Sequence, residues 1–170
     1  MNPVCQLNDY NFTKLSIEWV PAGNGGEFVI NNLATRFSYD VYKNPDNELE
    51  YLMRFWAAFH EETEDKERVG YQITSEIFGN FTLDESVEEE QCPSLIRHNG
   101  VSILLGLLRA QIGINTGSFY GSKLIIPTIM PQEIVAEVEK IKANAQKTAK
   151  KKAVKRVAKK VAKKRLAKSK

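Results

Sequence analysis

A short glycine-containing stretch, Gly117 to Lys123 (GSFYGSK), is the part of this sequence that comes closest to a phosphate-binding loop. Such a loop surrounds phosphate oxygens with backbone N–H groups, has four residues between its outer glycines, and ends in Gly-Lys-Ser/Thr. Here three residues separate Gly117 from Gly121, and Ser122 precedes Lys123 instead of following it. We therefore do not expect a nucleotide site in this stretch.

Four further side chains belong to the types that bind metal ions or act as nucleophiles, but their spacing argues against either role. Zinc sites bring cysteines and histidines together in pairs that lie a few residues apart. The four residues stand apart from one another, and we expect each to be structural or simply exposed: Cys5, His60, Cys92 and His98. The carboxylate runs at residues 61–65 and 88–90 are typical of solvated loops. The sequence predicts no enzyme, no metal and no cofactor.

The composition fits one folded domain with an appendage, since domains usually contain about 100 to 150 residues and this chain has 170. With 42% hydrophobic residues the chain can build a core, and no apolar run is long enough for a membrane span. The start of the sequence, MNPVCQLNDYNF, lacks the basic flank and the long apolar segment of a secretory signal. We expect a cytoplasmic protein with reduced thiols.

Charge is divided very unevenly along the chain. Residues 1–139 contain all 21 acidic residues and 9 of the 24 lysines and arginines, a net charge of −12. Residues 140–170 contain the other 15 basic residues and no acidic one, a net charge of +15. Such asymmetry indicates an interaction segment attached to a folded domain. We predict a folded domain at residues 1–145 and a Lys/Ala/Val-rich tail at residues 146–170.

The tail is expected to be disordered, or to form a helix only beside a polyanion, because like charges four residues apart oppose helix formation. Three partners stay open for it: the phosphates of a nucleic acid, an anionic membrane surface, and the acidic body of the same or a neighbouring subunit. The candidate anion-binding residues are Lys151, Lys152, Lys155, Arg156, Lys159, Lys160, Lys163, Lys164 and Arg165.

Upstream of the tail, the hydrophobic pattern predicts four strands followed by two helices, an α+β architecture. Alternation marks strands at residues 14–19, 33–43, 50–61 and 69–83. Short turns between them favour an antiparallel sheet, which commonly packs one face and leaves the other in water. Apolar residues spaced by three and four over residues 103–112 predict a helix that covers one face. Glycines end its periodicity, a short extended piece follows at residues 124–127, and Pro131 starts the second helix.

The third strand is apolar on both sides, so some of its apolar side chains must lie on the face of the sheet that α-helical residues are not expected to cover. Leu52, Trp56 and Ala58 lie on the face that otherwise carries polar residues, and Phe78 of the fourth strand joins them. A contiguous apolar patch there indicates a binding surface or an oligomer contact. The alternative is that a loop or a partner subunit buries it.

The order of elements and several short motifs resemble the SecB family of export chaperones. Residues 15–18 (LSIE), followed by Pro21, are similar to a hydrophobic-Ser-Phe-Glu-x-x-Pro stretch of that family. Residues 77–83 (IFGNFTL) are similar to its glycine-containing fourth strand. The helix signature and the Leu-x-Leu-x-Pro-Ile segment of the family are similar to residues 103–112 (ILLGLLRAQI) and 124–129 (LIIPTI). The resemblance runs along most of residues 7–140.

The resemblance implies a four-stranded antiparallel sheet with two following helices, assembled as a dimer of dimers. It also implies docking on the translocase motor SecA, for which Glu18 keeps one of the carboxylates of the family. Lys14 stands where the family has an Asp, and Gln72 and Thr74 stand where it has an apolar residue and a Glu. The fold implication is therefore stronger than the SecA implication.

Our interpretation is a chaperone that binds unfolded or non-native polypeptides without ATP, in protein export. Such a protein needs exposed apolar grooves more than a shaped pocket, since it must accept many sequences. The candidate lining residues are Leu52, Trp56, Ala58, Tyr71, Phe78 and Phe81. For Tyr71 and Phe81, which lie on the inner register, an ordinary core role is at least as well supported. Two other functions stay open: a dedicated antitoxin chaperone, and a nucleic-acid-associated protein that acts through the basic tail.

Overall fold

The computed structural model describes residues 4–21, 32–63, 67–118, 123–145 and 147–148. Within them the chain forms four strands and then two helices, which confirms the predicted α+β order. The chain divides into two compact units, Met1–Val135 and Ala136–Lys170, and the sheet lies in the first. The elements are β1 (Cys5–Val20), β2 (Asn32–Lys43), β3 (Glu50–Glu62), β4 (Arg68–Leu83), α1 (Cys92–Thr116) and a second helix at residues 131–145.

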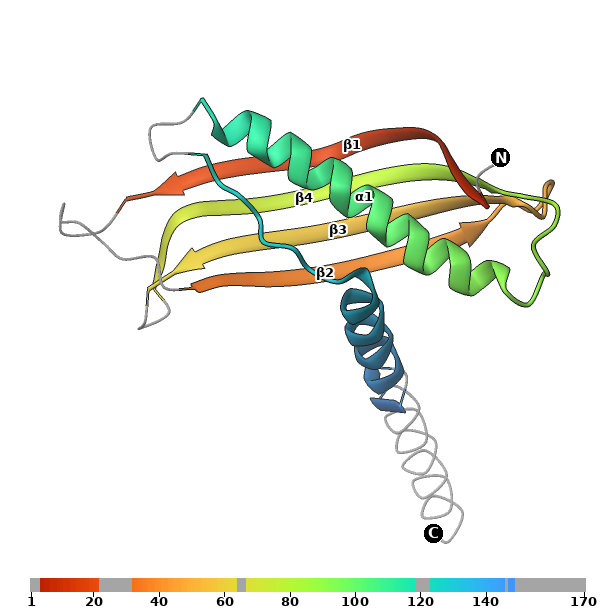
Figure 1. Cartoon of the computed structure of the whole chain (residues 1–170). Helices are drawn as coiled ribbons and strands as arrows, with labels where there is room; N and C mark the ends of the chain where they lie inside the picture. The colour runs from red at the N-terminus through yellow and green to blue at the C-terminus, as the bar shows by residue number, and fades with distance from the viewer. Residues whose placement is uncertain (1–3, 22–31, 64–66, 119–122, 146, 149–170) are drawn as a thin grey trace, which may run out of the picture. The chain divides into compact units, whose positions relative to one another are not determined.

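The sheet has the strand order β1-β4-β3-β2, and all neighbouring strands are antiparallel. β1 and β2, consecutive in the chain, therefore lie at opposite edges of the sheet (Figure 1). The two central strands, β3 and β4, are hydrogen-bonded on both sides.

One face of the sheet, the inner face, is covered by α1, which contacts all four strands (Figure 1). Alternate residues of each strand point into the space beneath the helix, where each large apolar side chain contributes about 1.5–3 kcal/mol when fully buried. The fully buried side chains of this core include Tyr39, Met53, Phe55, Phe59, Ile73, Ile77, Phe81, Ile96, Leu104 and Leu108. The predicted helix therefore covers the predicted sheet.

Two glycines let α1 lie close to the sheet. A Cβ atom at Gly100 of the helix would stand 2.5 Å from the Sδ atom of Met53 on β3. A Cβ atom at Gly79 of β4 would stand 2.8 Å from Cδ2 of Leu104 on the helix. Real Cβ contacts are not this short, so a larger residue at either position would force the Met53 or Leu104 side chain, or the backbone near it, to move.

The helix is longer than the predicted apolar stripe. It begins at Cys92, with Pro93 in its first turn, so the 103–112 stripe is only its later part. Of the glycines expected to end the periodicity, Gly113 lies buried within the last turns of the helix, so it does not break it. Gly117 stands at the C-cap, directly after the last helical residue, Thr116.

Thr116 fixes the chain that follows the helix. Its hydroxyl donates to the carbonyl of Ile112 at 2.8 Å and accepts from the backbone N–H of Leu124 at 3.0 Å. The hydroxyl of Tyr71 on β4 also donates to the Thr116 carbonyl, at 3.4 Å. These bonds anchor the extended segment at residues 123–130 to the end of α1.

β1 extends well before the predicted residues 14–19, since it begins at Cys5. The pairing of β1 with β4 shifts register twice, between Leu7 and Asp9 and between Phe12 and Lys14. Each bulge inserts an extra residue and moves the following side chains to the other face. The alternation is therefore interrupted in the first half of β1, and a strict two-residue pattern does not reveal it.

The pairing of β3 with β4 is also irregular, close to the start of β4. The pairing shifts between His60 and Glu62, and Gly70 has a positive φ of 67°. The Glu61 carboxylate is buried there and accepts the backbone N–H of Tyr71 at 2.5 Å. The side-chain amide of Gln72 donates to the carbonyls of Glu61 and Val69, at 3.0 and 3.1 Å. Hydrogen bonds from side chains thus replace backbone hydrogen bonds that the irregular strand pairing leaves out.

Candidate functional site

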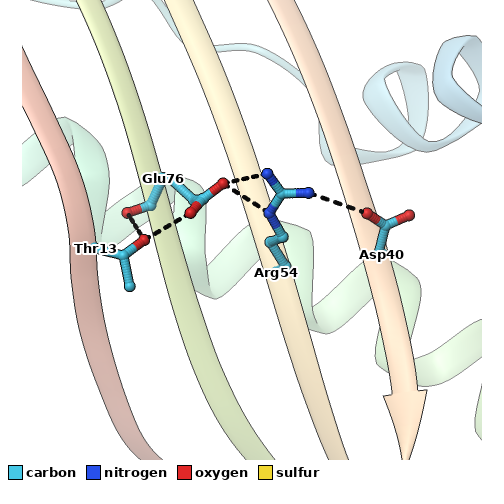
Figure 2. A network of polar contacts seen from close by, with 4 residues as sticks. All are labelled: Thr13, Asp40, Arg54 and Glu76. Atoms are coloured by element: carbon cyan, nitrogen blue, oxygen red, sulfur yellow. Dashed lines mark hydrogen bonds and ion pairs between the residues drawn. The ribbon is translucent and has the colours of Figure 1, made fainter.

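The second face of the sheet, here called the outer face, points away from α1 (Figure 2). No helix or strand of the described part of residues 1–135 lies over it. Directly paired residues of antiparallel strands share a face, so the register defines its members. They include Lys14, Ser16 and Glu18 on β1, Gln72, Thr74, Glu76, Phe78 and Asn80 on β4, Leu52, Arg54, Trp56, Ala58 and His60 on β3, and Arg36, Ser38, Asp40 and Tyr42 on β2.

Four large apolar or aromatic side chains stand on this face: Tyr42, Leu52, Trp56 and Phe78, here called the outer-face cluster. Leu52, Trp56 and Phe78 are partly exposed, and Tyr42, which pairs directly with Leu52, is 51% exposed. Ala58 shares the face but is buried among its larger neighbours. The register therefore confirms that Leu52, Trp56, Ala58 and Phe78 lie on one face, and it adds Tyr42, which sequence reasoning missed.

A row of polar side chains crosses the same face from one edge of the sheet to the other (Figure 2). Arg54 donates to the Oε2 atom of Glu76 from both Nε, at 2.7 Å, and Nη2. Its Nη1 atom lies 3.6 Å from Oδ2 of Asp40. On the far side of Glu76, the hydroxyl of Thr13 donates to Oε1 at 2.8 Å. Thr13, Glu76, Arg54 and Asp40 thus connect β1, β4, β3 and β2.

The network holds Glu76 in its charged form. The hydrogen bond from Thr13 and the one from Arg54 both lower the pKa of the Glu76 carboxyl below its ordinary value, because both donors favour the carboxylate. The Arg54 guanidinium is in turn bounded by two carboxylates, so it is engaged on both sides. A ligand on this face would therefore meet a satisfied polar row in place of a free cation.

The polar row runs through the outer-face cluster. Arg54 pairs directly with Phe78, and Glu76 pairs directly with Trp56. The sequence predicted one contiguous apolar patch, whereas the face is mixed, with apolar side chains on both sides of a charged row. The signal lay in opposite charges at outer positions of three strands, but it becomes readable only once register and strand order are known.

A hollow of about 310 Å³ opens at one end of the strands, beside the turn between β2 and β3. Leu52 and Tyr42 of the outer-face cluster line it, together with Phe81 and Tyr51. Two of the predicted lining residues, Leu52 and Phe81, therefore meet at one concave place. The remaining lining residues are polar or belong to the turn: Asn8, Lys43, Asn44, Pro45, Glu50 and Asn80.

Tyr71 and Phe81 belong to the inner face. They are 2% and 1% exposed, and Tyr71 packs edge to face against Trp19 of β1 with ring centroids 4.8 Å apart. Both are core residues in this structure. Neither contributes to the outer-face cluster, although Phe81 reaches the hollow at the end of the strands.

The predicted partner-binding residue, Glu18, is exposed on the outer face of β1. Its carboxylate accepts a 3.3 Å hydrogen bond from the Ser16 hydroxyl. Glu18 pairs directly with Gln72, whose side-chain amide donates to the carbonyls of Glu61 and Val69. The nine predicted anion-binding residues of the tail, from Lys151 to Arg165, lie outside the described residues.

A second hollow, of about 490 Å³, lies beside α1 and the extended segment after it. Gly106, Ala110 and Gly113 form its floor on the helix, and Ile114 and Ile125 stand beside it with exposures of 69% and 74%. Arg109, Lys123, Leu124 and Ile126 complete its lining. Sequence reasoning missed this hollow, although small residues spaced by three and four on one helix face are the signal for it.

Among the described residues, no group of three or more His, Cys, Asp or Glu side chains is placed to hold a metal ion. No helix in the described part of the chain is long and apolar enough to cross a membrane. The two cysteines are free thiols, with Cys92 buried at the start of α1 and Cys5 partly exposed.

Comparison with known proteins gives a structural relation without a sequence relation. No family model matches the sequence, and no curated protein matches it. Among solved structures, the chain is similar to the SecB-like chaperone of Mycobacterium tuberculosis, which was solved in complex with a ChAD peptide from an antitoxin. The TM-score is 0.55 at 14% identity, and the match covers 74% of this chain and 90% of that one. The chain therefore shares the SecB-like fold.

Proposed function

We propose that this protein is a holding chaperone, which binds unfolded or non-native polypeptide segments without ATP. The observation that carries the proposal is the outer-face cluster, four large apolar or aromatic side chains on a sheet face over which the described chain of residues 1–135 lays no element. The similar mycobacterial chaperone holds a peptide segment from an antitoxin, which supports peptide binding as a use of this fold. No residue arrangement described above is suited to chemical catalysis.

The mixed character of the outer face suits this task. Burial of apolar surface contributes about 25 cal/mol per Å². Much of this free energy is offset because the client loses translational and rotational freedom when it binds. A segment that covers the cluster would gain contacts with Trp56 and Phe78, and its polar groups would lie against the row through Arg54 and Glu76. Each site would therefore bind weakly and tolerate many sequences.

Oligomerisation would turn weak sites into a useful affinity. Linked sites raise the effective concentration of the next client segment, so overall affinity can exceed that of any one site by a large factor. We propose the dimer of dimers expected from the SecB resemblance, acting in the cytoplasm. The hollow beside α1 gives each subunit a second apolar site, lined by Ile114 and Ile125.

The residues favour a dedicated polypeptide client over proteins that are exported through SecA. Of the positions implied for SecA docking, only Glu18 keeps a carboxylate, and Lys14 on the same strand face has the opposite charge. The antitoxin peptide held by the similar chaperone supports the dedicated alternative. A pull-down of SecA with the full chain, repeated with Glu18→Lys, separates the two: Glu18-dependent capture would favour export.

The experiment that tests chaperone activity is suppression of aggregation of a chemically denatured protein by the purified full chain. We expect the double variant Trp56→Gln/Phe78→Gln to lose client affinity by at least about tenfold, equivalent to about 1.4 kcal/mol. The matched control is Val4→Gln, since Val4 is an exposed apolar residue just before β1 and does not belong to the outer-face cluster.

Thermal unfolding of each variant separates loss of binding from loss of fold. The proposal fails if the full chain does not suppress aggregation, or if the folded double variant suppresses it as well as Val4→Gln does. A spectroscopic check uses Trp19→Phe, which leaves Trp56 as the only tryptophan. Client binding over the outer-face cluster should then shift the emission of Trp56.

A further inference from the structure

The basic C-terminal segment, residues 140–170, has no role in the proposed chaperone activity. It holds 15 of the 24 lysines and arginines and no acidic residue, and 13 of those basic residues fall in the last 24 positions. The remaining 139 residues carry a net charge of −12. Concentration of one sign in one segment, against the opposite sign elsewhere, indicates a partner of dense negative charge.

The segment begins on the last turns of a helix whose earlier residues Ile134, Val135 and Val138 are buried. Lys140 is exposed near the end of the helix at residues 131–145, and Lys147 is exposed just beyond it. Residues 147–148 are helical as well, and the Thr148 hydroxyl donates to the carbonyl of Asn144 at 2.9 Å. Lys140 and Lys147 are therefore exposed to solvent on helical backbone.

We propose that residues 140–170 bind nucleic acid through its phosphate backbone, without preference for base sequence. Lysine and arginine supply the phosphate contacts, and the segment contains no aromatic residue that could stack on bases. Its only side-chain amides are Asn144 and Gln146, at the beginning, so little is available to read base edges. The contacts come from the lysines and arginines between Lys140 and Lys170, among them the nine residues from Lys151 to Arg165.

The composition favours nucleic acid over a membrane surface. A helix that lies in a membrane interface places Trp, Phe or Leu on its apolar side. From residue 147 onward the apolar residues other than alanine are Val154, Val157, Val161 and Leu166. Three valines and one leucine give too small an apolar face for insertion, so anionic lipid would attract the segment by charge alone.

The acidic body is the remaining competitor. Contact with it would need close approach, because charges further apart than a Debye length of about 8 Å at physiological salt are largely screened. The phosphates of duplex DNA follow one another at about 1.7 Å of helix axis. We therefore expect a nucleic acid to displace the body from the basic segment.

The experiment measures binding of the full chain to a fluorescent DNA duplex at increasing salt concentrations. If six to eight of the basic residues contact phosphates, log K against log salt should have a slope of about −5 to −7. Two duplexes of unrelated sequence should bind equally. The comparison variant keeps the length and replaces the nine residues from Lys151 to Arg165 that are lysine or arginine with glutamine, and it should bind at least about a hundredfold more weakly.

Each other outcome overturns the proposal. It fails if the full chain does not bind duplex at low salt, if the neutralised variant binds equally well, or if the salt slope is near zero. Binding that differs strongly between the two duplexes excludes a backbone-only mode. Retention on vesicles with phosphatidylserine, without retention on DNA, assigns the segment to membranes.

The same variant separates this proposal from the chaperone activity. Suppression of aggregation by the neutralised chain should equal that of the full chain, because the outer-face cluster is unchanged. If the neutralised chain loses suppression of aggregation and the full chain does not bind duplex, the basic segment serves clients and not nucleic acid. Thermal unfolding confirms that the neutralised variant is folded.

Discussion

The two faces of the sheet are built from adjacent residues of the same strands, yet they follow different rules. On the inner face of β3, Met53, Phe55 and Phe59 are fully buried under α1. On the outer face, Trp56 is partly exposed beside the charged pair of Arg54 and Glu76. The inner face is closely packed against one fixed partner, whereas the outer face keeps its apolar side chains separated by charges. That separation lets the outer face remain in water while it stays able to bind apolar segments.

We expect the largest difference between the two faces when two neighbouring side chains, one on each face, are truncated to alanine. Phe55→Ala should lower the free energy of unfolding by about 3–5 kcal/mol, because it opens a cavity under α1. Trp56→Ala should lower it by less than half of that, since the indole is only partly buried, and it should weaken client binding. Urea unfolding measures the first quantity and suppression of aggregation the second. Equal destabilisation by both variants would show that the outer face is core in the assembled protein.

A second test concerns how closely α1 approaches the sheet. Gly100→Ala should destabilise by about 1–3 kcal/mol, because its Cβ would collide with Met53. The matched control is Gly106→Ala on the same helix, where no atom lies within 4 Å of the added Cβ. This variant should stabilise by about 0.5–1 kcal/mol, since alanine is the better helix former. A stabilising Gly100→Ala would contradict the close approach.

Where the sequence could predict the structure, the signal was local. The side-chain pattern located β2, β3 and β4, and their bounds differ little from those predicted. The first half of β1 was missed because its bulges break the alternation. Helix periodicity placed the part of α1 that carries its apolar stripe, but not the first turns after Pro93.

Features that depend on pairing between distant residues lay beyond the sequence. Strand order places β1 beside β4, a choice that the side-chain pattern of neither strand decides. The row through Thr13, Glu76, Arg54 and Asp40 needs that order and the register before its members can be recognised as neighbours. The outer position of Phe78, by contrast, could be inferred from its own strand, because it falls out of step with Ile77 and Phe81.

A smaller effect should come from the charged row that separates the apolar side chains. Arg54→Met removes the guanidinium between Asp40 and Glu76 and joins the apolar side chains into one patch. We expect a slightly less stable protein, since Glu76 and Asp40 both lose their contact with the guanidinium, together with tighter client binding and more self-association. Light scattering and suppression of aggregation measure these properties. Weaker client binding by this variant would show that the row itself contacts clients.

The pH dependence of stability gives two further tests of opposite sign, and the first concerns the outer face. The pKa of Glu76 is lowered by Thr13 and Arg54, so its stabilising contribution is present above the ordinary pKa of 4.5. That contribution is lost as the pH falls through the lowered pKa of the folded state. Wild type should therefore lose stability on acidification more steeply than Glu76→Gln. Denaturant midpoints between pH 7 and pH 3 measure the difference, and parallel curves would contradict it.

The smallest effect should come from Glu61, the buried carboxylate at the bulge between β3 and β4. Burial raises its pKa above the ordinary 4.5, although the N–H of Tyr71 acts in the opposite direction. Its charged form therefore weakens the fold above the raised pKa, and the weakening disappears as the pH falls below the ordinary value. Glu61→Gln keeps an oxygen for Tyr71, so it should match or slightly exceed wild type at pH 7 and converge with it near pH 4. Denaturant midpoints across the same range measure this, and a Glu61→Gln variant that is much weaker at pH 7 would show that the bulge requires the charge. Because Glu76 lies on the bare face and Glu61 is buried, the two variants report separately on how each environment treats a carboxylate.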